Sequence, residues 1–125
     1  MIVLDTHAWL WWRVRPRELS RRAKRAIEAA DEVGVCTVSV YELVSLVERG
    51  RVRLGMPVRR WLGSALGEPV TALELRPEVA VDAAQLGFEA DPFDRIIYAT
   101  ARAEDAPLVT RDERMHAFDP ARAVW

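Results

Sequence analysis

The sequence predicts an α/β fold of three layers, in which a central parallel sheet is covered by helices on both faces. Two observations support this class. Short apolar segments that are typical of buried strands alternate along the chain with segments whose apolar residues recur at helical spacing. The chain has 125 residues, of which 50% are hydrophobic, and no linker-like stretch interrupts it, so we expect one domain over residues 1–125.

The expected elements alternate regularly. Apolar runs predict strands at 1–4, 35–38, 70–75, 108–110 and 123–125. Helical periodicity, with prolines at helix starts and glycines after helix ends, predicts helices at about 5–12, 16–30, 39–50, from residue 57, at 77–86 and at 92–103. In this interpretation Gly34 ends the second helix and Ser39 caps the third.

Composition limits the possible functions. No apolar stretch approaches the roughly 18 residues of a membrane span, and no basic segment precedes an apolar one at the N-terminus. We therefore expect a cytoplasmic protein without membrane contact. Cys36 is the single cysteine and falls in an expected strand, so we interpret it as a small buried hydrophobe rather than a redox or zinc residue.

Arginine supplies almost all of the positive charge, because Lys24 is the only lysine. The net charge is -1, and arginines gather between residues 13 and 25 and again between residues 49 and 60. The planar guanidinium suits bidentate contacts with phosphate, so these clusters would suit a polyanion. The alternative is that they are solvated faces of helices.

Four acidic residues lie at or just beyond the ends of apolar segments. They are Asp5, Glu42, Asp94 and Asp112. Because the carboxyl ends of parallel strands meet in one crevice, we expect these four carboxylates to converge. Carboxylates packed together repel one another unless a cation lies between them, and oxygen ligands suit a hard divalent ion. The pattern predicts a magnesium-dependent enzyme that acts on phosphate esters.

Each acid also has a purely structural interpretation. Asp5 is a possible helix N-cap, and Glu42 a possible partner of Ser39 in a capping box. Asp91 before Pro92 fits an N-cap, which places Asp94 in the first helical turn, where a negative charge favours the helix dipole. Asp112 is compatible with a polar turn. These alternatives stay open at this point.

Four segments of the chain resemble, in order and spacing, the signature segments of PIN-domain proteins, and of the VapC-type ribonuclease toxins of bacterial toxin–antitoxin systems in particular. The segments are Leu4-Asp5-Thr6-His7-Ala8, Ser39-Val40-Tyr41-Glu42-Leu43, residues 91–101 from Asp91-Pro92-Phe93-Asp94-Arg95 onward, and Val109-Thr110-Arg111-Asp112-Glu113. The resemblance covers essentially the whole chain, and the combination of segments is what makes it specific.

The resemblance implies a three-layer α/β/α fold, a Mg²⁺ or Mn²⁺ site and endoribonuclease activity on RNA. It places the acidic site on Asp5, Glu42, Asp94 and Asp112, with the Thr110 hydroxyl beside it. It further implies a homodimer that is inhibited by a small cognate antitoxin. The apolar residues expected to form a groove for an antitoxin helix are Val44, Leu46, Val47, Val52 and Leu54.

The residue inventory argues against covalent catalysis, because no serine, cysteine or histidine has a convincing partner for nucleophile activation. A metal ion would instead activate water for attack on a phosphodiester. Arg95 and Arg111 each stand beside a metal-site acid, where either a contact with the scissile phosphate or a structural salt bridge is possible. An alternative function is that of a non-catalytic RNA-binding or scaffold PIN domain, which loss of one of the acids would favour; none is lost.

Overall fold

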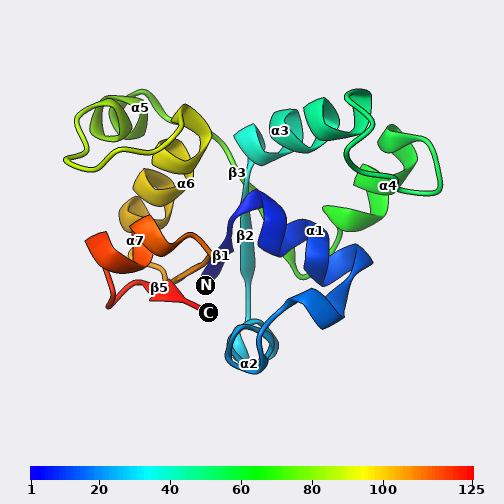
Figure 1. Cartoon of the computed structure of the whole chain (residues 1–125), viewed down its shortest axis with the longest axis horizontal. Helices are drawn as coiled ribbons and strands as arrows, with labels where there is room; N and C mark the ends of the chain where they lie inside the picture. The colour runs from blue at the N-terminus through cyan, green and yellow to red at the C-terminus, as the bar shows by residue number, and fades with distance from the viewer.

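A sheet of five short strands runs through the middle of the computed structural model, which describes all 125 residues (Figure 1). The strands are β1 (Ile2–Leu4), β2 (Val33–Cys36), β3 (Val70–Leu73), β4 (Leu108–Val109) and β5 (Ala123–Val124). Their order across the sheet is β3-β2-β1-β4-β5, and every neighbouring pair is parallel. The predicted parallel sheet is therefore confirmed.

The order of the strands defines where a ligand would bind. From β1 the chain adds strands first on one side, through β2 and β3, and then on the other, through β4 and β5. The connections on the two sides of this switch point diverge, which leaves a crevice beyond the carboxyl ends of β1 and β4. The register pairs Leu4 with Val109, so Asp5 and Thr110 follow at the same edge of the sheet.

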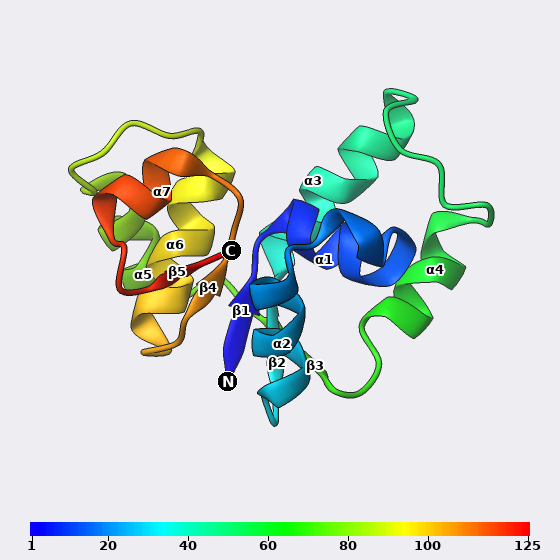
Figure 2. The ribbon, with the colours of Figure 1, turned by 60° about the horizontal axis from the view of Figure 1, so that its bottom comes forward.

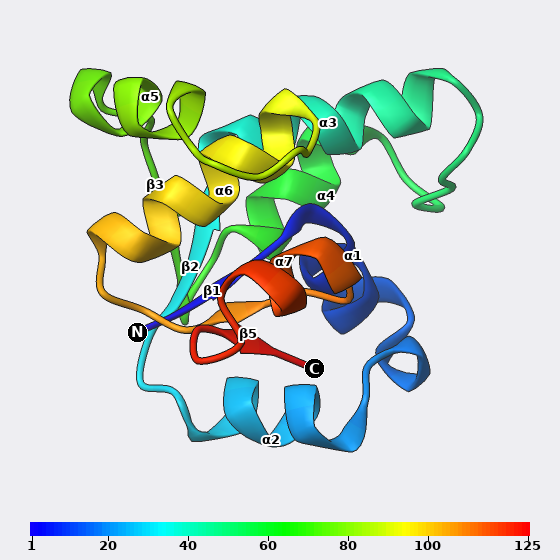
Figure 3. The same cartoon turned by 60° about the vertical axis from the view of Figure 1, so that its left-hand side comes forward.

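Helices cover both faces of the sheet, as Figure 2 shows. They are α1 (Thr6–Val14), α2 (Arg21–Ala29), α3 (Thr37–Glu48), α4 (Val58–Ala65), α5 (Pro77–Ala84), α6 (Pro92–Ala103) and α7 (Glu113–Phe118), with a 3-10 turn at Pro16–Glu18. One apolar cluster joins α1, α2, α3 and α4 to the sheet, and a second joins α6 and α7 to the opposite face. Helix α5 packs on α6 (Figure 3). The three-layer α/β/α class is confirmed.

Alternating side chains of the central strand explain why the chain folds into layers. Ile2 and Leu4 belong to the first apolar cluster, whereas Val3 belongs to the second. Successive side chains of a strand point to opposite faces, and all three residues are buried, so β1 needs helices on both sides. None of those helices is both long and apolar enough to cross a membrane.

Several expected boundaries were wrong. Pro16 opens only the 3-10 turn, and α2 begins at Arg21 because the hydroxyl of Ser20 accepts a hydrogen bond from the N–H of Ala23 at 3.0 Å. Gly34 does not end that helix but lies within β2, where an added Cβ would stand 2.7 Å from the Leu73 side chain. Close approach of the next strand, rather than a helix terminus, explains this glycine.

Helix α3 begins at Thr37, two residues before the predicted cap. Ser39 is therefore inside the first turn, fully buried, and its hydroxyl has no hydrogen-bond partner. The capping box between Ser39 and Glu42 is wrong. The last helix, α7, had not been predicted.

Candidate functional site

A cleft of about 520 Å³ opens at the carboxyl edge of the sheet, and most of its lining is acidic. We call it the acidic cleft. Its walls come from the ends of β1 and β4 and from the starts of α1, α3, α6 and α7. The lining residues are Asp5, His7, Trp11, Glu42, Asp91, Asp94, Arg111, Asp112 and Glu113. All four acids selected from the sequence therefore line one cleft.

Asp5 is fixed in the cleft by the backbone on both sides. Its N–H donates to the carbonyl of Val109 at 3.0 Å, which continues the ladder between β1 and β4, and its carboxylate accepts from the N–H of Ala8 at 2.7 Å. The predicted N-cap role is thus confirmed, although it does not exclude a second role. Only 9% of Asp5 is exposed, and this burial raises the pKa of its carboxyl, against the opposing effect of the Thr110 hydroxyl.

Thr110 and Asp112 occupy the equivalent place after β4. Thr110 is fully buried, and its hydroxyl accepts a hydrogen bond from the N–H of Asp112 at 3.1 Å. Asp112 caps α7 by accepting from the N–H of Arg114 at 2.9 Å. The predicted polar turn is therefore the start of a helix, and it directs the Asp112 side chain into the cleft.

Glu42 and Asp94 reach the cleft from helices rather than from strand ends. Glu42 lies in the second turn of α3, and Asp94 lies in the first turn of α6 behind the N-cap Asp91, which accepts from the N–H of Asp94 at 2.9 Å. The pKa of the Asp94 carboxyl is raised to about 7. Burial is the largest cause, and repulsion from the carboxylates of Asp91, Glu42, Asp112 and Asp5 adds to it. Such a carboxyl is ionised at little cost only when a cation lies beside it.

Sequence reasoning missed Arg114, which contacts two of the four acids. Its Nη2 lies 2.8 Å from Oδ2 of Asp112 and 3.5 Å from Oδ2 of Asp94, while its Nε lies 3.1 Å from Oδ1 of Asp112. This guanidinium lowers the pKa of Asp112 through its hydrogen bonds. At 3.5 Å it does not offset the burial and repulsion that act on Asp94. No pattern pointed to Arg114, because α7 has only six residues and shows little periodicity.

The two arginines selected as possible phosphate contacts differ. Arg95 donates to backbone carbonyls at and beyond the end of α5, including those of Ala83 and Ala84 at 3.0 Å, so its guanidinium is engaged away from the cleft. It stabilises a helix C-terminus, and the structure gives no support to a phosphate contact by it. Arg111, by contrast, is exposed and lines the acidic cleft.

The donor set of the cleft fits a hard divalent cation, since Asp5, Glu42, Asp94 and Asp112 offer only carboxylate oxygens. A positive group already contacts both Asp94 and Asp112 in the form of the Arg114 guanidinium. The carboxylates do not form a closed cage, because no three His, Cys, Asp or Glu side chains stand at metal-ligand spacing.

Comparison with known proteins identifies the family. The PIN domain profile matches residues 2–120. The chain belongs to the PIN-domain family. This PIN domain is 42% identical over 125 residues to Ribonuclease VapC22 of Mycobacterium tuberculosis (strain ATCC 25618 / H37Rv), and the match spans 98% of this chain and 95% of the relative.

Solved structures of other proteins have a fold similar to that of this PIN domain. A toxin–antitoxin complex from Klebsiella pneumoniae aligns with a TM-score of 0.71 at 19% identity, over 100% of this PIN domain and 97% of that chain. The sarcin-ricin loop cleaving toxin VapC20 of Mycobacterium tuberculosis aligns with a TM-score of 0.69 at 18% identity, over 94% and 95% of the two chains. At such identities these likenesses show the fold.

Proposed function

We propose that this PIN domain is a Mg²⁺-dependent endoribonuclease of the VapC toxin type, which hydrolyses RNA phosphodiesters at the acidic cleft. The observation that carries the proposal is the convergence of Asp5, Glu42, Asp94 and Asp112 in one cleft, with the pKa of Asp94 raised to about 7. Clustered carboxylates that destabilise one another are typical of functional sites. The 42% identity to Ribonuclease VapC22 supports RNA as the substrate.

Each residue of the cleft has a role in this proposal. Asp5, Asp94 and Asp112 would hold a Mg²⁺ ion, for which Mn²⁺ can substitute, and Glu42 would complete the site from α3. The ion supplies Lewis-acid activation of water and neutralises charge on the phosphate. The buried Thr110 hydroxyl would hold Asp112 in place through the hydrogen bond that it accepts from the N–H of Asp112, and, against the larger effect of burial, it lowers the pKa of the Asp5 carboxyl. Arg111, which is exposed and lines the cleft, would contact a phosphate oxygen through its guanidinium.

A small antitoxin is the proposed protein partner. The groove that we expect it to occupy lies beside α3, where Leu46, Val47, Val52 and Leu54 are half-buried. A basic side chain of the partner would enter the acidic cleft, and the contacts of Arg114 with Asp94 and Asp112 support the fit of a guanidinium there. An inhibited complex in which the cleft remains open to solvent would contradict this arrangement.

Self-association is also part of the proposal. Helices α5 and α6 present a shallow apolar hollow of about 280 Å³, lined mainly by Ala80, Ala83, Ala84, Pro92 and Ile96, and Val81 beside it is exposed. Small apolar side chains of this kind permit close packing of helices from a second copy. Sedimentation at micromolar concentration should show a dimer, and a monomer would argue against it.

The nuclease proposal is tested by incubating the purified protein with a labelled single-stranded RNA in Mg²⁺, in Mn²⁺ and in EDTA. We expect cleavage with either metal and none in EDTA. Asp5→Asn should be inactive in the same assay, because it removes an anionic ligand without changing the shape of the side chain. Cleavage that persists in EDTA, or in Asp5→Asn, would contradict the proposal.

A further inference from the structure

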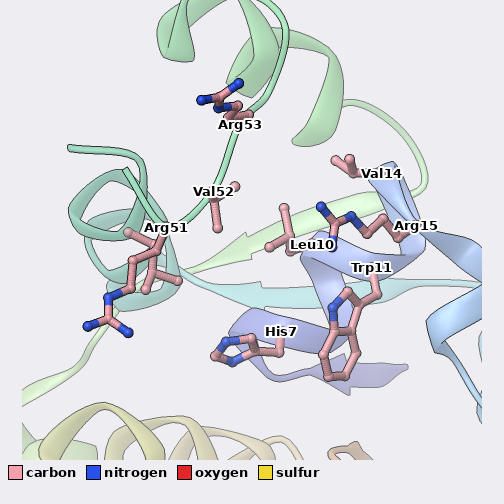
Figure 4. Close-up of a pocket in the computed structure, with 9 residues that line it drawn as sticks. His7, Leu10, Trp11, Val14, Arg15, Arg51, Val52 and Arg53 are labelled. Carbon is pink, nitrogen blue, oxygen red and sulfur yellow. The ribbon is translucent and has the colours of Figure 1, made fainter. Parts of the chain in front are cut away.

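A second cavity, of about 320 Å³, lies farther along α1, next to the acidic cleft. Its walls are one face of α1 and the end of α3 with the segment that follows, as Figure 4 shows. The lining residues are His7, Leu10, Trp11, Val14, Arg15, Leu46, Arg51, Val52 and Arg53. We call it the arginine pocket. It shares Leu46 and Val52 with the groove beside α3, but its arginines have no part in the proposed reaction.

The charges of the arginine pocket are uncompensated. Arg15, Arg51 and Arg53 are all exposed, and none of their guanidinium groups takes part in any of the six ion pairs of the protein. No acidic residue lines the pocket. In Figure 4 the Arg15 guanidinium lies beside Leu10, over the hollow, while Arg51 and Arg53 stand on the opposite rim with their guanidinium groups directed outward. Three cations around one hollow attract an anion.

The floor of the pocket is apolar, which narrows the class of anion. Leu10, Val14, Leu46 and Val52 contribute aliphatic surface, and Trp11 contributes an aromatic ring. A free inorganic anion gains nothing from such surface, and a peptide helix would match the pocket only if it carried acidic side chains beside an apolar face. A nucleotide matches both parts, because its base presents a flat aromatic face for stacking and its phosphate is an anion.

The pocket is also continuous with the acidic cleft. His7 and Trp11 line both hollows, with their ring centroids 5.5 Å apart, and Trp11 is held on another side by Trp125 at 5.7 Å. A strand of RNA that passes over this aromatic pair would place one nucleotide in each hollow. The two hollows have opposite charge, which suits a cation-assisted reaction on one side and direct phosphate binding on the other.

We propose that the arginine pocket is a nucleotide subsite, in which the nucleotide next to the scissile phosphate of a single-stranded RNA places its base against the apolar floor, and the phosphates on either side of it bind to the arginines of the rim, Arg15, Arg51 and Arg53. This assignment rests on the proposed nuclease function and deepens it. Cleavage takes place in the acidic cleft, and the arginine pocket binds the neighbouring nucleotide.

RNA binding measured without cleavage tests the assignment. Fluorescence anisotropy of a labelled single-stranded RNA of about ten nucleotides is recorded in EDTA at several salt concentrations, in an Asp94→Asn background. Arg15→Ala and Arg53→Ala should each weaken binding about fivefold and lower the slope of log affinity against log salt by about 0.7, the value expected for one lost phosphate contact with a single strand. A mononucleotide should compete with the RNA more strongly than inorganic phosphate does.

Arg25→Ala is the matched control. Arg25 is an exposed arginine of α2 without an ion pair, it lines neither hollow, and its loss changes the net charge by the same amount. It should leave both the affinity and the salt slope unchanged. Because all three arginines are exposed and unpaired, circular dichroism melts of the variants should match those of the parent protein.

Three outcomes would overturn the assignment. The first is that Arg15→Ala and Arg53→Ala bind RNA with the same affinity and salt dependence as Arg25→Ala. Another is unchanged RNA binding together with weakened binding of the antitoxin, which would assign the pocket to a protein partner. A third is equal competition by phosphate and mononucleotide. Failure of the nuclease proposal is distinguished by the cleavage assay, because a wild-type protein that cleaves no RNA in Mg²⁺ can still show pocket-dependent binding in EDTA.

Discussion

The acidic cleft and the arginine pocket lie on two sides of the same pair of rings, His7 and Trp11, yet they are built differently. The acids of the cleft are held by the fold: Asp5 caps α1, and Asp112 caps α7. The arginines of the pocket are exposed and have no acidic partner. A reacting group must be held in position, whereas a group that provides affinity can adapt to its ligand.

The difference extends to stability. In the cleft, burial and mutual repulsion raise the pKa of Asp94, so the charged form of that residue opposes folding until a cation arrives. In the pocket, the arginines remain in water, and their mutual repulsion is screened. We therefore expect changes in the cleft to alter catalysis and stability together, and changes in the pocket to alter RNA affinity alone.

The largest effect should come from removing a ligand at the centre of the cleft. Asp94→Asn keeps the shape of the side chain but removes its charge, and the loss of several kcal/mol of transition-state stabilisation corresponds to a fall in RNA cleavage on the order of 10³-fold. Single-turnover cleavage in Mg²⁺ measures it. Asp91→Asn is the control, because asparagine caps α6 as aspartate does, and equal inactivity of the two variants would mean that the ligands are wrongly assigned.

A smaller effect should appear in the pH dependence of the metal-free protein. The folded pKa of Asp94 is about 7 and the unfolded value is 3.8, so between these pH values the folded state binds more protons. The stability of the protein in EDTA should therefore fall as pH rises from about 4 to 7. Lowering the pH again within this range should restore the stability. Partial solvent screening limits the change to the order of 1 kcal/mol.

Urea unfolding of wild type and Asp94→Asn in EDTA at pH 5 and pH 8 measures this effect. The variant should lose less stability than wild type between the two values, because it has no proton to release. Parallel pH profiles for the two proteins would show that Asp94 is not the group responsible.

The smallest effect concerns Arg114, which contacts Asp112 and Asp94 where the metal ion would bind. Its side chain is 57% exposed, so water screens these ion pairs and they contribute little to stability. Removing this competing cation in Arg114→Ala should tighten Mn²⁺ binding by about threefold, as measured by calorimetry. Weaker Mn²⁺ binding would mean that Arg114 positions the ligands rather than competes with the ion.

Much of the fold could be predicted from the sequence, because its signals are local. Apolar runs and helical spacing indicated the layers, and Asp91-Pro92 indicated the start of α6 correctly. The convergence of the acids followed from one general property of parallel sheets, since Asp5 and Asp112 follow neighbouring strands. Asp94 and Glu42 were found by the same logic, although they reach the cleft from helices.

What could not be predicted depends on contacts between distant segments. Thr37 rather than Ser39 begins α3, because packing against the sheet buries Ser39 and overrides its preference for a cap. The engagement of Arg95 depends on where α5 ends against α6. The arginine pocket joins α1 to residues some forty positions later, so the sequence showed clusters of arginine but not which of them face one hollow.

The central claim is that the four carboxylates form a cation site rather than a set of helix caps. Thermal melts of wild type and Asp94→Asn at pH 8, with EDTA or with millimolar Mg²⁺, test it most directly. In EDTA the variant should melt several degrees higher, because relief of repulsion is worth on the order of 1 kcal/mol in a domain of this size. Mg²⁺ should raise the melting temperature of wild type much more than that of the variant, so that the difference between the two melting temperatures becomes smaller or changes sign. A wild type that is already the more stable protein in EDTA, and that gains nothing from Mg²⁺, would contradict the account.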